Sequence, residues 1–477
     1  MPNSTTNSTT NSTSSGTLTS IYEEPAVIKR TQRSGALEEV TSNGTVAAAV
    51  MVGAALLALV VANSPAYEAV EHFLMQPLTI GFGDILASIS VEGLVNDFLM
   101  AIFFLLVGIE LKYEMTVGQL RRPRQAALPM LAAVGGVAMP ALIYLLFNAA
   151  GRAHGWAVPI ATDIAFALGV ASLLGDKISP ETKVFFQTLA IADDILAIVV
   201  IAVAYGQAPD IAWCAASAIV IVVLWGLNHA KVYSLKPYLA VGLVLWVCMY
   251  NSGIHATLAG VILAFALPAQ SDVNLNEFGA WLGKKAQVLD DRYDDERHVL
   301  GQHSFTKGAL KVESVIHHVT PPLERMEHYI SVPVNFLILP IFAFVNAQLH
   351  LVGTDFTSIV ADPVAQGVYL GAVLGKPLGI FLVTFLLVKI GFAKLPEHMD
   401  WVQVAAVGIM GGLGFTMSIL ISGLAFTEPG EVLAAKCAIL LGSVTSAVLG
   451  ILFVKVATAR RDASAERSAA EGASERG

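Results

Sequence analysis

The chain consists mainly of long apolar segments separated by short polar loops. Such segments lie at about 45–63, 94–109, 126–149, 156–174, 184–205, 211–227, 237–250, 253–268, 333–347, 366–388, 402–424 and 434–456. Most of them approach the ~20 residues that a helix needs to cross the hydrocarbon core of a bilayer. The pattern therefore predicts an all-α polytopic membrane protein with about twelve transmembrane helices.

The composition favours a membrane protein over a soluble domain. Of the 477 residues, 55% are hydrophobic and 14% are charged, and the mean hydropathy is +0.67. The net charge of -9 says little about partners, and we expect neither a nucleic-acid partner nor a cofactor. Cys214, Cys248 and Cys437 lie in apolar segments without metal or disulfide spacing, which is typical of core residues. We also expect no cleavable signal peptide.

Positive charge is sorted between the loops. Lys and Arg follow the second, fourth, sixth and tenth segments, at Lys112, Arg121, Arg122, Arg124, Lys177, Lys183, Lys231, Lys236, Lys389 and Lys394. Loops 64–92, 206–210 and 350–365 contain none, and 150–155 contains only Arg152. Because cytoplasmic loops are enriched in Lys and Arg, we expect both termini and the even-numbered loops in the cytoplasm. Lys436, near the start of the last segment, is a minor exception.

The polar segments complete the domain organisation. We expect a cytoplasmic tail at 1–42, eight spans at 43–268, a cytoplasmic insertion at 269–330, four spans at 331–457 and a cytoplasmic tail at 458–477. The first tail carries Ser/Thr-rich repeats typical of disorder, and the insertion suggests a partly helical, partly disordered region. Residues 76–91 alternate in part around Gly81-Phe-Gly-Asp84, which predicts an external β-hairpin.

Two adjacent carboxylates lie near the middle of one apolar segment. Asp193 and Asp194 follow the largely apolar residues 184–192 and precede an apolar run. Each aspartate at the centre of a membrane helix costs roughly 2.5–3.5 kcal/mol on insertion scales. The alternative is a helix cap or an interfacial pair, but caps lie at helix ends. The pattern therefore favours a cation or proton site buried at mid-membrane.

Two further segments contain helix-weakening residues at corresponding places. Thr162-Asp163 interrupts the fourth segment, and Gly411-Gly412-Leu-Gly414 interrupts the eleventh. Paired interruptions in two three-helix units, spans 3–5 and 10–12, predict discontinuous helices at a transport site in an inverted repeat. The alternative for the glycines is close helix packing.

Lys376 is a third buried charge, in the middle of the tenth segment and followed by Pro377. It lies too deep to reach an interface. Interrupted helices expose N–H groups at one end and carbonyls at the other. A carboxylate such as Asp163 would offset the first and a lysine the second. Since Lys376 cannot reach an interface, we expect it to pair with the Asp193–Asp194 site.

Five strings together resemble the NhaA-type bacterial sodium/proton antiporters. They are ATDIAFALGV at 161–170, LAIADDILAI at 189–198, HATLAGV at 255–261, LGKPLGI at 374–380 and GGLGFTMSI at 411–419. The resemblance covers roughly 45–268 and 330–456. It implies electrogenic exchange of Na⁺ or Li⁺ for more than one proton across a bacterial inner membrane, exporting Na⁺ and activated as pH rises. It also implies a homodimer formed through hairpin 76–91, surrounded by membrane lipid.

The resemblance assigns roles to particular residues. It implies that Asp193 and Asp194 bind the transported Na⁺ and that Lys376 is their buried cationic partner. Thr162 and Asp163 match the family's helix crossing, and Asp97 matches a functional aspartate of the second span.

A pH response is expected at the cytoplasmic mouth. Glu110 and Glu114 share a helix face, and Glu327 and His328 open the ninth span from the same side. Like charges raise the proton affinity of carboxylates, and histidine titrates near neutral pH. We assign His255 to the same response. The alternative for this cluster is an ordinary solvated loop face.

Two other functions are compatible with buried aspartates. A sodium-coupled solute symporter would need a roomy cavity, whereas two carboxylates, a lysine and a threonine suit a bare cation. An intramembrane aspartyl protease is suggested only by the fragments Gly81-Phe-Gly-Asp84 and Pro140-Ala-Leu142. We therefore expect a transporter and not an enzyme.

Overall fold

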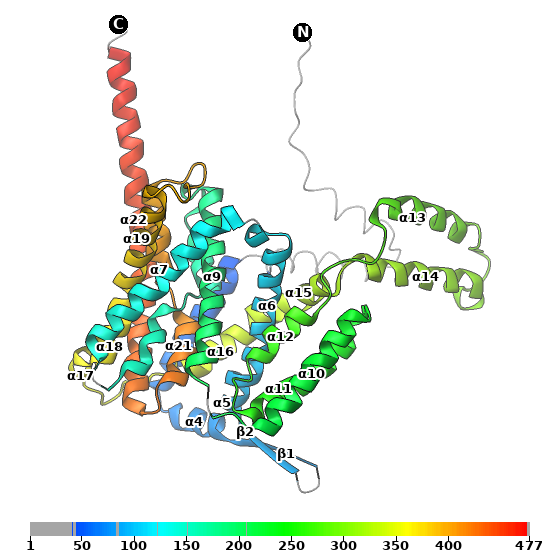
Figure 1. The fold of residues 1–477 in the computed structure, drawn as a ribbon, viewed down its shortest axis with the longest axis horizontal. Coiled ribbons are helices and arrows are strands. Elements are labelled where there is room, and N and C mark those ends of the chain that lie inside the picture. Colours follow the sequence, from blue (N-terminus) through cyan, green and yellow to red (C-terminus); the bar gives the residue numbers. More distant parts are fainter. Residues whose placement is uncertain are drawn as a thin grey trace.

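The computed structural model describes residues 41, 44–82, 85–121, 123–149, 151–206 and 208–474. The predicted N-terminal tail lies outside these residues, apart from Thr41. Within the described residues, helices form a bundle and the two strands form one small sheet (Figure 1).

The first half of the described chain contains the following elements: α3 (Gly44–Ala62), α4 (Tyr67–Met75), β1 (Pro77–Phe82), β2 (Ile85–Ser90), α5 (Val91–Gly93), η1 (Leu94–Leu99), α6 (Met100–Thr116), η2 (Gln119–Arg121), α7 (Pro123–Asn148), η3 (Ala153–Ile160), α8 (Ile164–Ser172), η4 (Gly175–Lys177), α9 (Pro180–Ala204), α10 (Ile211–His229), α11 (Leu235–Ser252) and α12 (Leu258–Ala266). The second half contains α13 (Leu275–Asp290), η5 (Val299–Gly301), α14 (His303–Val319), α15 (Pro322–Pro333), η6 (Val334–Ile338), α16 (Leu339–Asn346), α17 (Phe356–Ala361), α18 (Pro363–Leu370), η7 (Gly371–Gly375), α19 (Lys376–Lys389), α20 (Trp401–Gly411), α21 (Phe415–Ala425) and α22 (Pro429–Ser474).

Long apolar helices confirm the prediction of a multi-pass membrane protein. Among the described residues, nine helical segments are long and apolar enough to cross a bilayer, or ten if the bent pair α20–α21 is one span. The predicted seventh and eighth spans correspond to α11 and α12, of which α12 has only 9 residues. A span needs about 20 residues. The count of twelve therefore stays a prediction.

The outside of the bundle is apolar, as a lipid-facing surface requires. On α10, for example, Ile211 is 84% exposed, Val222 71% and Trp225 68%. Apolar patches of this kind are rare on proteins that face water. Inside the bundle, α7 and α19 touch backbone to backbone, because a Cβ atom on Gly135 or Gly379 would collide with the carbonyl oxygen of the other glycine.

Two apolar segments are interrupted and cross each other. Extended residues 161–163 separate η3 from α8, and residues 412–414 separate α20 from α21, with a bend of 46°. The backbone N–H of Asp163 donates to the carbonyl of Leu413 at 2.6 Å, which ties the two interruptions together. That they are discontinuous membrane helices of an inverted repeat stays a prediction.

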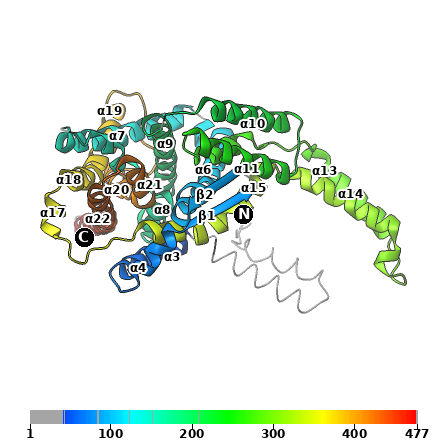
Figure 2. The same ribbon diagram turned by 90° about the horizontal axis from the view of Figure 1, so that it is seen from below.

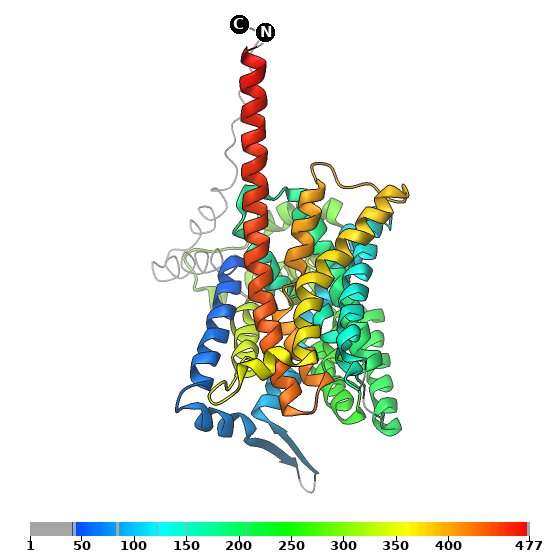
Figure 3. The same ribbon diagram turned by 90° about the vertical axis from the view of Figure 1, so that its left-hand side faces the viewer.

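The other predicted segments have defined secondary structure. Strands β1 and β2 pair antiparallel from Pro77 opposite Ser90 to Phe82 opposite Ile85. They extend from the end of the bundle opposite the projecting end of α22 (Figures 1 and 3). Where α22 reaches its predicted tail at 458–477, the helix continues without a break to Ser474.

The insertion is more ordered than the sequence suggests. Helices α13 and α14 fill most of it and extend sideways from the bundle (Figure 2). Apolar contacts account for the difference. The Tyr293 and Phe305 rings lie 5.3 Å apart, and Leu289 packs against Gly308.

Candidate functional site

Asp163 holds the amino-terminal ends of both short helices at the crossing. Its Oδ1 accepts a hydrogen bond from the backbone N–H of Phe166 in α8 at 3.0 Å. Its Oδ2 accepts from the backbone N–H of Thr416 in α21 at 3.1 Å and from the Thr416 hydroxyl at 2.5 Å. Helix amino termini carry partial positive charge, so one carboxylate compensates two of them.

Lys376 lies at the opposite, carbonyl-rich ends of the interruptions. Its Nζ donates to the carbonyl of Ile160, at the end of η3. It also donates to Thr162 Oγ1 and to Asp193 Oδ2, both at 2.6 Å. The Thr162 hydroxyl lies 2.6 Å from Asp193 Oδ2 and 3.0 Å from the carbonyl of Gly411, at the end of α20. The lysine therefore offsets one carbonyl end directly, while the threonine reaches the other.

The buried Lys376 side chain lies beside two glycines, Gly136 and Gly411. A Cβ atom on Gly411 would lie 3.8 Å from Lys376 Cγ, and one on Gly136 would lie 3.9 Å from Cε. Lys376 is 0% exposed and Asp193 is 1% exposed. A buried ion pair of this kind is tolerated only when hydrogen bonds satisfy the remaining groups, which Thr162 and Ile160 do here.

The two adjacent aspartates of α9 face different surroundings, because consecutive helical residues point about 100° apart. Asp193 faces Lys376, whereas Asp194 faces a cavity of about 190 Å³. Asp194 is buried, and its Oδ1 has no hydrogen-bond partner among the described residues. An unpaired charge in such surroundings is costly unless a proton or a cation neutralises it.

The Asp194 cavity has an acidic lining. Asp163, Asp194 and Glu110 contribute three carboxylates, Thr416 and Asn335 contribute further oxygen atoms, and the lining contains no lysine or arginine. Hard cations prefer carboxylate and carbonyl oxygens. Among the described residues, no group of three or more His, Cys, Asp or Glu side chains is close enough to form a resident metal site. The cavity is thus suited to a small cation in transit.

The predicted pH-response residues do not all come together. Glu110 lines the Asp194 cavity and is repelled by Glu114 and Glu327. His328 is exposed, and the centroid of its ring lies 6.2 Å from that of Tyr329.

His255 and Asp97 also lie apart from the acidic group. His255 is in contact with Tyr205, at the carboxyl end of α9, and its Nε2 has no partner among the described residues. The Trp246 indole donates to the backbone carbonyl of Asp97 at 3.3 Å. Asp97 lies in η1, about 20 Å along the helix from Glu110 at 1.5 Å per residue.

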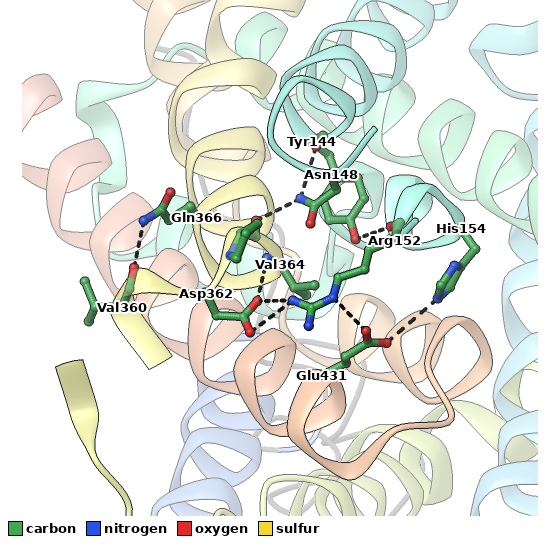
Figure 4. Close-up of polar contacts among 10 residues, drawn as sticks. Tyr144, Asn148, Arg152, His154, Val360, Asp362, Val364, Gln366 and Glu431 are labelled. Atoms are coloured by element: carbon green, nitrogen blue, oxygen red, sulfur yellow. Dashed lines mark hydrogen bonds and ion pairs between the residues drawn. The ribbon is translucent and has the colours of Figure 1, made fainter. Parts of the chain in front are cut away.

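A second charged cluster lies outside the predicted site. It joins the residues before η3 to the start of α18 and of α22 (Figure 4). Arg152 Nη1 donates to both Asp362 carboxylate oxygens at 3.0 and 3.2 Å, and its Nε lies 2.9 Å from Glu431 Oε1. His154 Nε2 lies 3.9 Å from the other Glu431 oxygen. The sequence indicated this cluster only through Arg152. It is the one Lys or Arg in the loops 64–92, 150–155, 206–210 and 350–365.

Comparison with known proteins identifies the family of this chain. The family described as Na+/H+ antiporter 1 matches residues 38–454. The chain is 40% identical to the Na(+)/H(+) antiporter NhaA of Helicobacter pylori strain G27, over 84% of this chain and 91% of the relative. It is also 40% identical to the NhaA of Wolinella succinogenes, over 84% of this chain and 89% of the relative. A solved structure of the sodium proton antiporter MjNhaP1 from Methanocaldococcus jannaschii covers 88% of this chain and 97% of its own, with 14% identity and a TM-score of 0.46. The chain belongs to the Na+/H+ antiporter 1 family.

Proposed function

We propose that this protein is an electrogenic antiporter that exports Na⁺, or Li⁺, across a bacterial inner membrane in exchange for protons. Its relatives are named Na(+)/H(+) antiporters. The observation that carries the proposal is the buried Asp194 carboxylate, which faces an acidic cavity without a hydrogen-bond partner for its Oδ1. In this proposal both termini are cytoplasmic, and the cavity opens toward the cytoplasm at Glu110.

Competition for shared carboxylates would make the exchange obligatory. Asp194 binds either Na⁺ or a proton, and Asp163 and Thr416 contribute further oxygen atoms from the same cavity. A cation that also engages Asp193 Oδ2 would compete with the Lys376 ammonium group for that oxygen. Two carboxylates can carry two protons in one direction against one monovalent cation in the other, which moves net charge.

The size of the cavity argues against the alternative of a sodium-coupled solute symporter. Its volume of about 190 Å³ lies below the ~300–1,000 Å³ typical of pockets that enclose organic ligands. The comparisons also give this alternative no support.

We further propose that the acidic group Glu110, Glu114 and Glu327 mediates the pH response. Glu110 connects it to the transport cavity, and deprotonation of the group would favour entry of a cation. The assignment of His328 and His255 to the same response rests on the sequence. A homodimer formed through the edge of the β1–β2 hairpin also remains part of the proposal.

The test uses everted membrane vesicles that hold a respiration-driven pH gradient, followed with a dye. Addition of Na⁺ or Li⁺ should collapse the gradient, while K⁺ and organic solutes should not. Asp194→Asn should abolish the collapse and Asp193→Asn should nearly abolish it, because a neutral amide cannot exchange a proton for a cation. Asp355→Asn, at an exposed helix cap, is the matched control. Near-normal Na⁺-dependent collapse in Asp194→Asn at normal expression would refute the assignment.

A further inference from the structure

A second cavity, of about 350 Å³, lies outside the transport site, where α9 and α20 begin beside residues 454–461 of α22. Its walls are apolar, with Ile178, Ala406 and Val454 among the lining residues. Its charged residues are Lys177, Arg460, Arg461 and Asp400. The volume falls within the ~300–1,000 Å³ typical of sites that bind small molecules.

The balance of charge in this cavity is positive. Arg461 Nη1 lies 3.6 Å from Asp400 Oδ2, so the one carboxylate is already engaged. Asp400 also caps α20 by accepting from the backbone N–H of Gln403 at 2.8 Å. In the described part of the chain, no acidic side chain pairs with Lys177 or Arg460. Two cationic side chains therefore remain available to an anion.

A fixed polar group lies between these cations and the apolar walls. Gln403 Oε1 accepts hydrogen bonds from Thr182 Oγ1 at 2.6 Å and from Ser179 Oγ at 3.3 Å. Its oxygen is thus engaged, which leaves the NH₂ group as a donor. Donors and positive charge with adjoining apolar walls match the two parts of a phospholipid.

The cavity lies at the border of the membrane. Lys177 precedes the span that begins at Pro180, and Arg460 and Arg461 end the span that begins at Pro429. Trp401 opens α20 at the same end, as aromatic residues do at membrane interfaces. Basic pockets between transmembrane helices at this level bind acidic headgroups.

We propose that this cavity binds an anionic phospholipid, with the phosphodiester between Lys177 and Arg460 and an acyl chain along the wall formed by α20 and α22. In the orientation proposed above, the lipid belongs to the cytoplasmic leaflet. The site is independent of the Asp194 cavity, and its occupancy does not require transport.

The test is native mass spectrometry of the full-length protein titrated with phosphatidylglycerol, and separately with phosphatidylcholine. Each neutralised basic residue should weaken phosphatidylglycerol binding about fivefold, so Lys177→Gln/Arg460→Gln should raise the dissociation constant by ~25-fold. Lys389→Gln/Lys394→Gln removes the same charge from exposed residues outside the cavity and should leave the dissociation constant unchanged. Ala457→Phe should weaken binding without any change in charge, because the ring occupies the cavity.

Several results would overturn the proposal. One is that the two double variants lose the same affinity for phosphatidylglycerol, and another is that Ala457→Phe binds it as tightly as the parent protein does. Either result would indicate that the lipid is attracted to the charged surface in general and not to the cavity. Phosphatidylcholine binding as tight as that of phosphatidylglycerol would exclude recognition of the acidic headgroup. Displacement of the lipid by an equal concentration of inorganic phosphate would show that the cavity takes a free anion instead.

Discussion

The cluster of Lys376 and Asp193 and the cluster of Arg152, Asp362 and Glu431 differ in burial and in the number of carboxylate oxygens that the cation contacts. Lys376 and Asp193 are buried at the crossing of the interrupted helices, whereas Arg152 is 39% exposed at the end of the bundle. Arg152 engages Asp362 with both carboxylate oxygens and Glu431 as well, a fixed geometry typical of guanidinium groups. Lys376 holds a single carboxylate oxygen of Asp193, together with one carbonyl and one hydroxyl.

The difference suggests separate roles for the two clusters. Arg152 makes several contacts at the surface, and no transported ion competes for its partners. Its role is therefore structural. An ammonium group that shares a buried carboxylate with a potential cation site can be displaced by that cation. The same comparison predicts how strongly each cluster responds to mutation.

The largest effect on stability is expected for Lys376→Ala. Removing one partner of a buried pair leaves Asp193 and the carbonyl of Ile160 unpaired, which should cost on the order of 3–5 kcal/mol. The variant should melt at a clearly lower temperature in detergent and transport weakly. Lys389→Ala, at an exposed position, is the control. A melting curve identical to that of the parent protein would mean that Lys376 is not in the buried pair.

A smaller loss is expected for Thr162→Val. The buried hydroxyl contacts Lys376, Asp193 and the carbonyl of Gly411, and unsatisfied buried groups cost about 1–3 kcal/mol. Thr162→Ser keeps the hydroxyl and should retain most of the stability. If the valine and serine variants unfold at the same temperature, the loss comes from packing and not from the hydrogen bonds.

Arg152→Gln should have a smaller effect still, about 1 kcal/mol or less, because water screens a partly exposed pair. The loss should shrink as salt is added, whereas the Lys376→Ala loss should not. Thermal melting at low and high salt measures both. If the stability lost in Arg152→Gln does not depend on salt, the Arg152 cluster behaves like the buried Lys376–Asp193 pair, and the proposed difference between the two clusters is wrong.

Glu327→Gln should leave stability nearly unchanged and shift the pH profile of transport. The substitution removes a like charge that acts on Glu110, so the pH at which activation begins should move. His328→Gln, at the neighbouring exposed position, should leave the profile in place. A change in apparent Na⁺ affinity with an unmoved profile would mean that Glu327 only attracts cations electrostatically.

The residues of the buried site could be identified from the sequence, because charged side chains are costly inside apolar segments. Thr162, Asp163, Asp193, Asp194 and Lys376 indeed lie together. The sequence could not decide which aspartate faces Lys376, since both neighbours satisfy the same pattern. That depends on the rotation of α9 against α19, which tertiary packing sets.

Other features depended on contacts that the sequence does not encode locally. Arg152 and Asp362 are separated by 210 residues, and neither lies in an apolar segment. Glu110 and Glu327 lie on helices far apart in the sequence, and only the fold brings the two carboxylates within electrostatic reach. The two helices of the insertion meet where the Tyr293 ring lies 5.3 Å from that of Phe305 and where Leu289 packs against Gly308, contacts that composition alone did not indicate.

The backbone contact between Gly135 and Gly379 limits how the molecule can move. With no side chains between them, α7 and α19 cannot slide past each other without parting their tightly packed backbones. Lys376 is three residues from Gly379 on α19, so its stem travels with α7. We therefore expect α7, α19 and the ammonium group to move as one body in any change of access, with the non-helical residues 161–163 and 412–414 as the hinges.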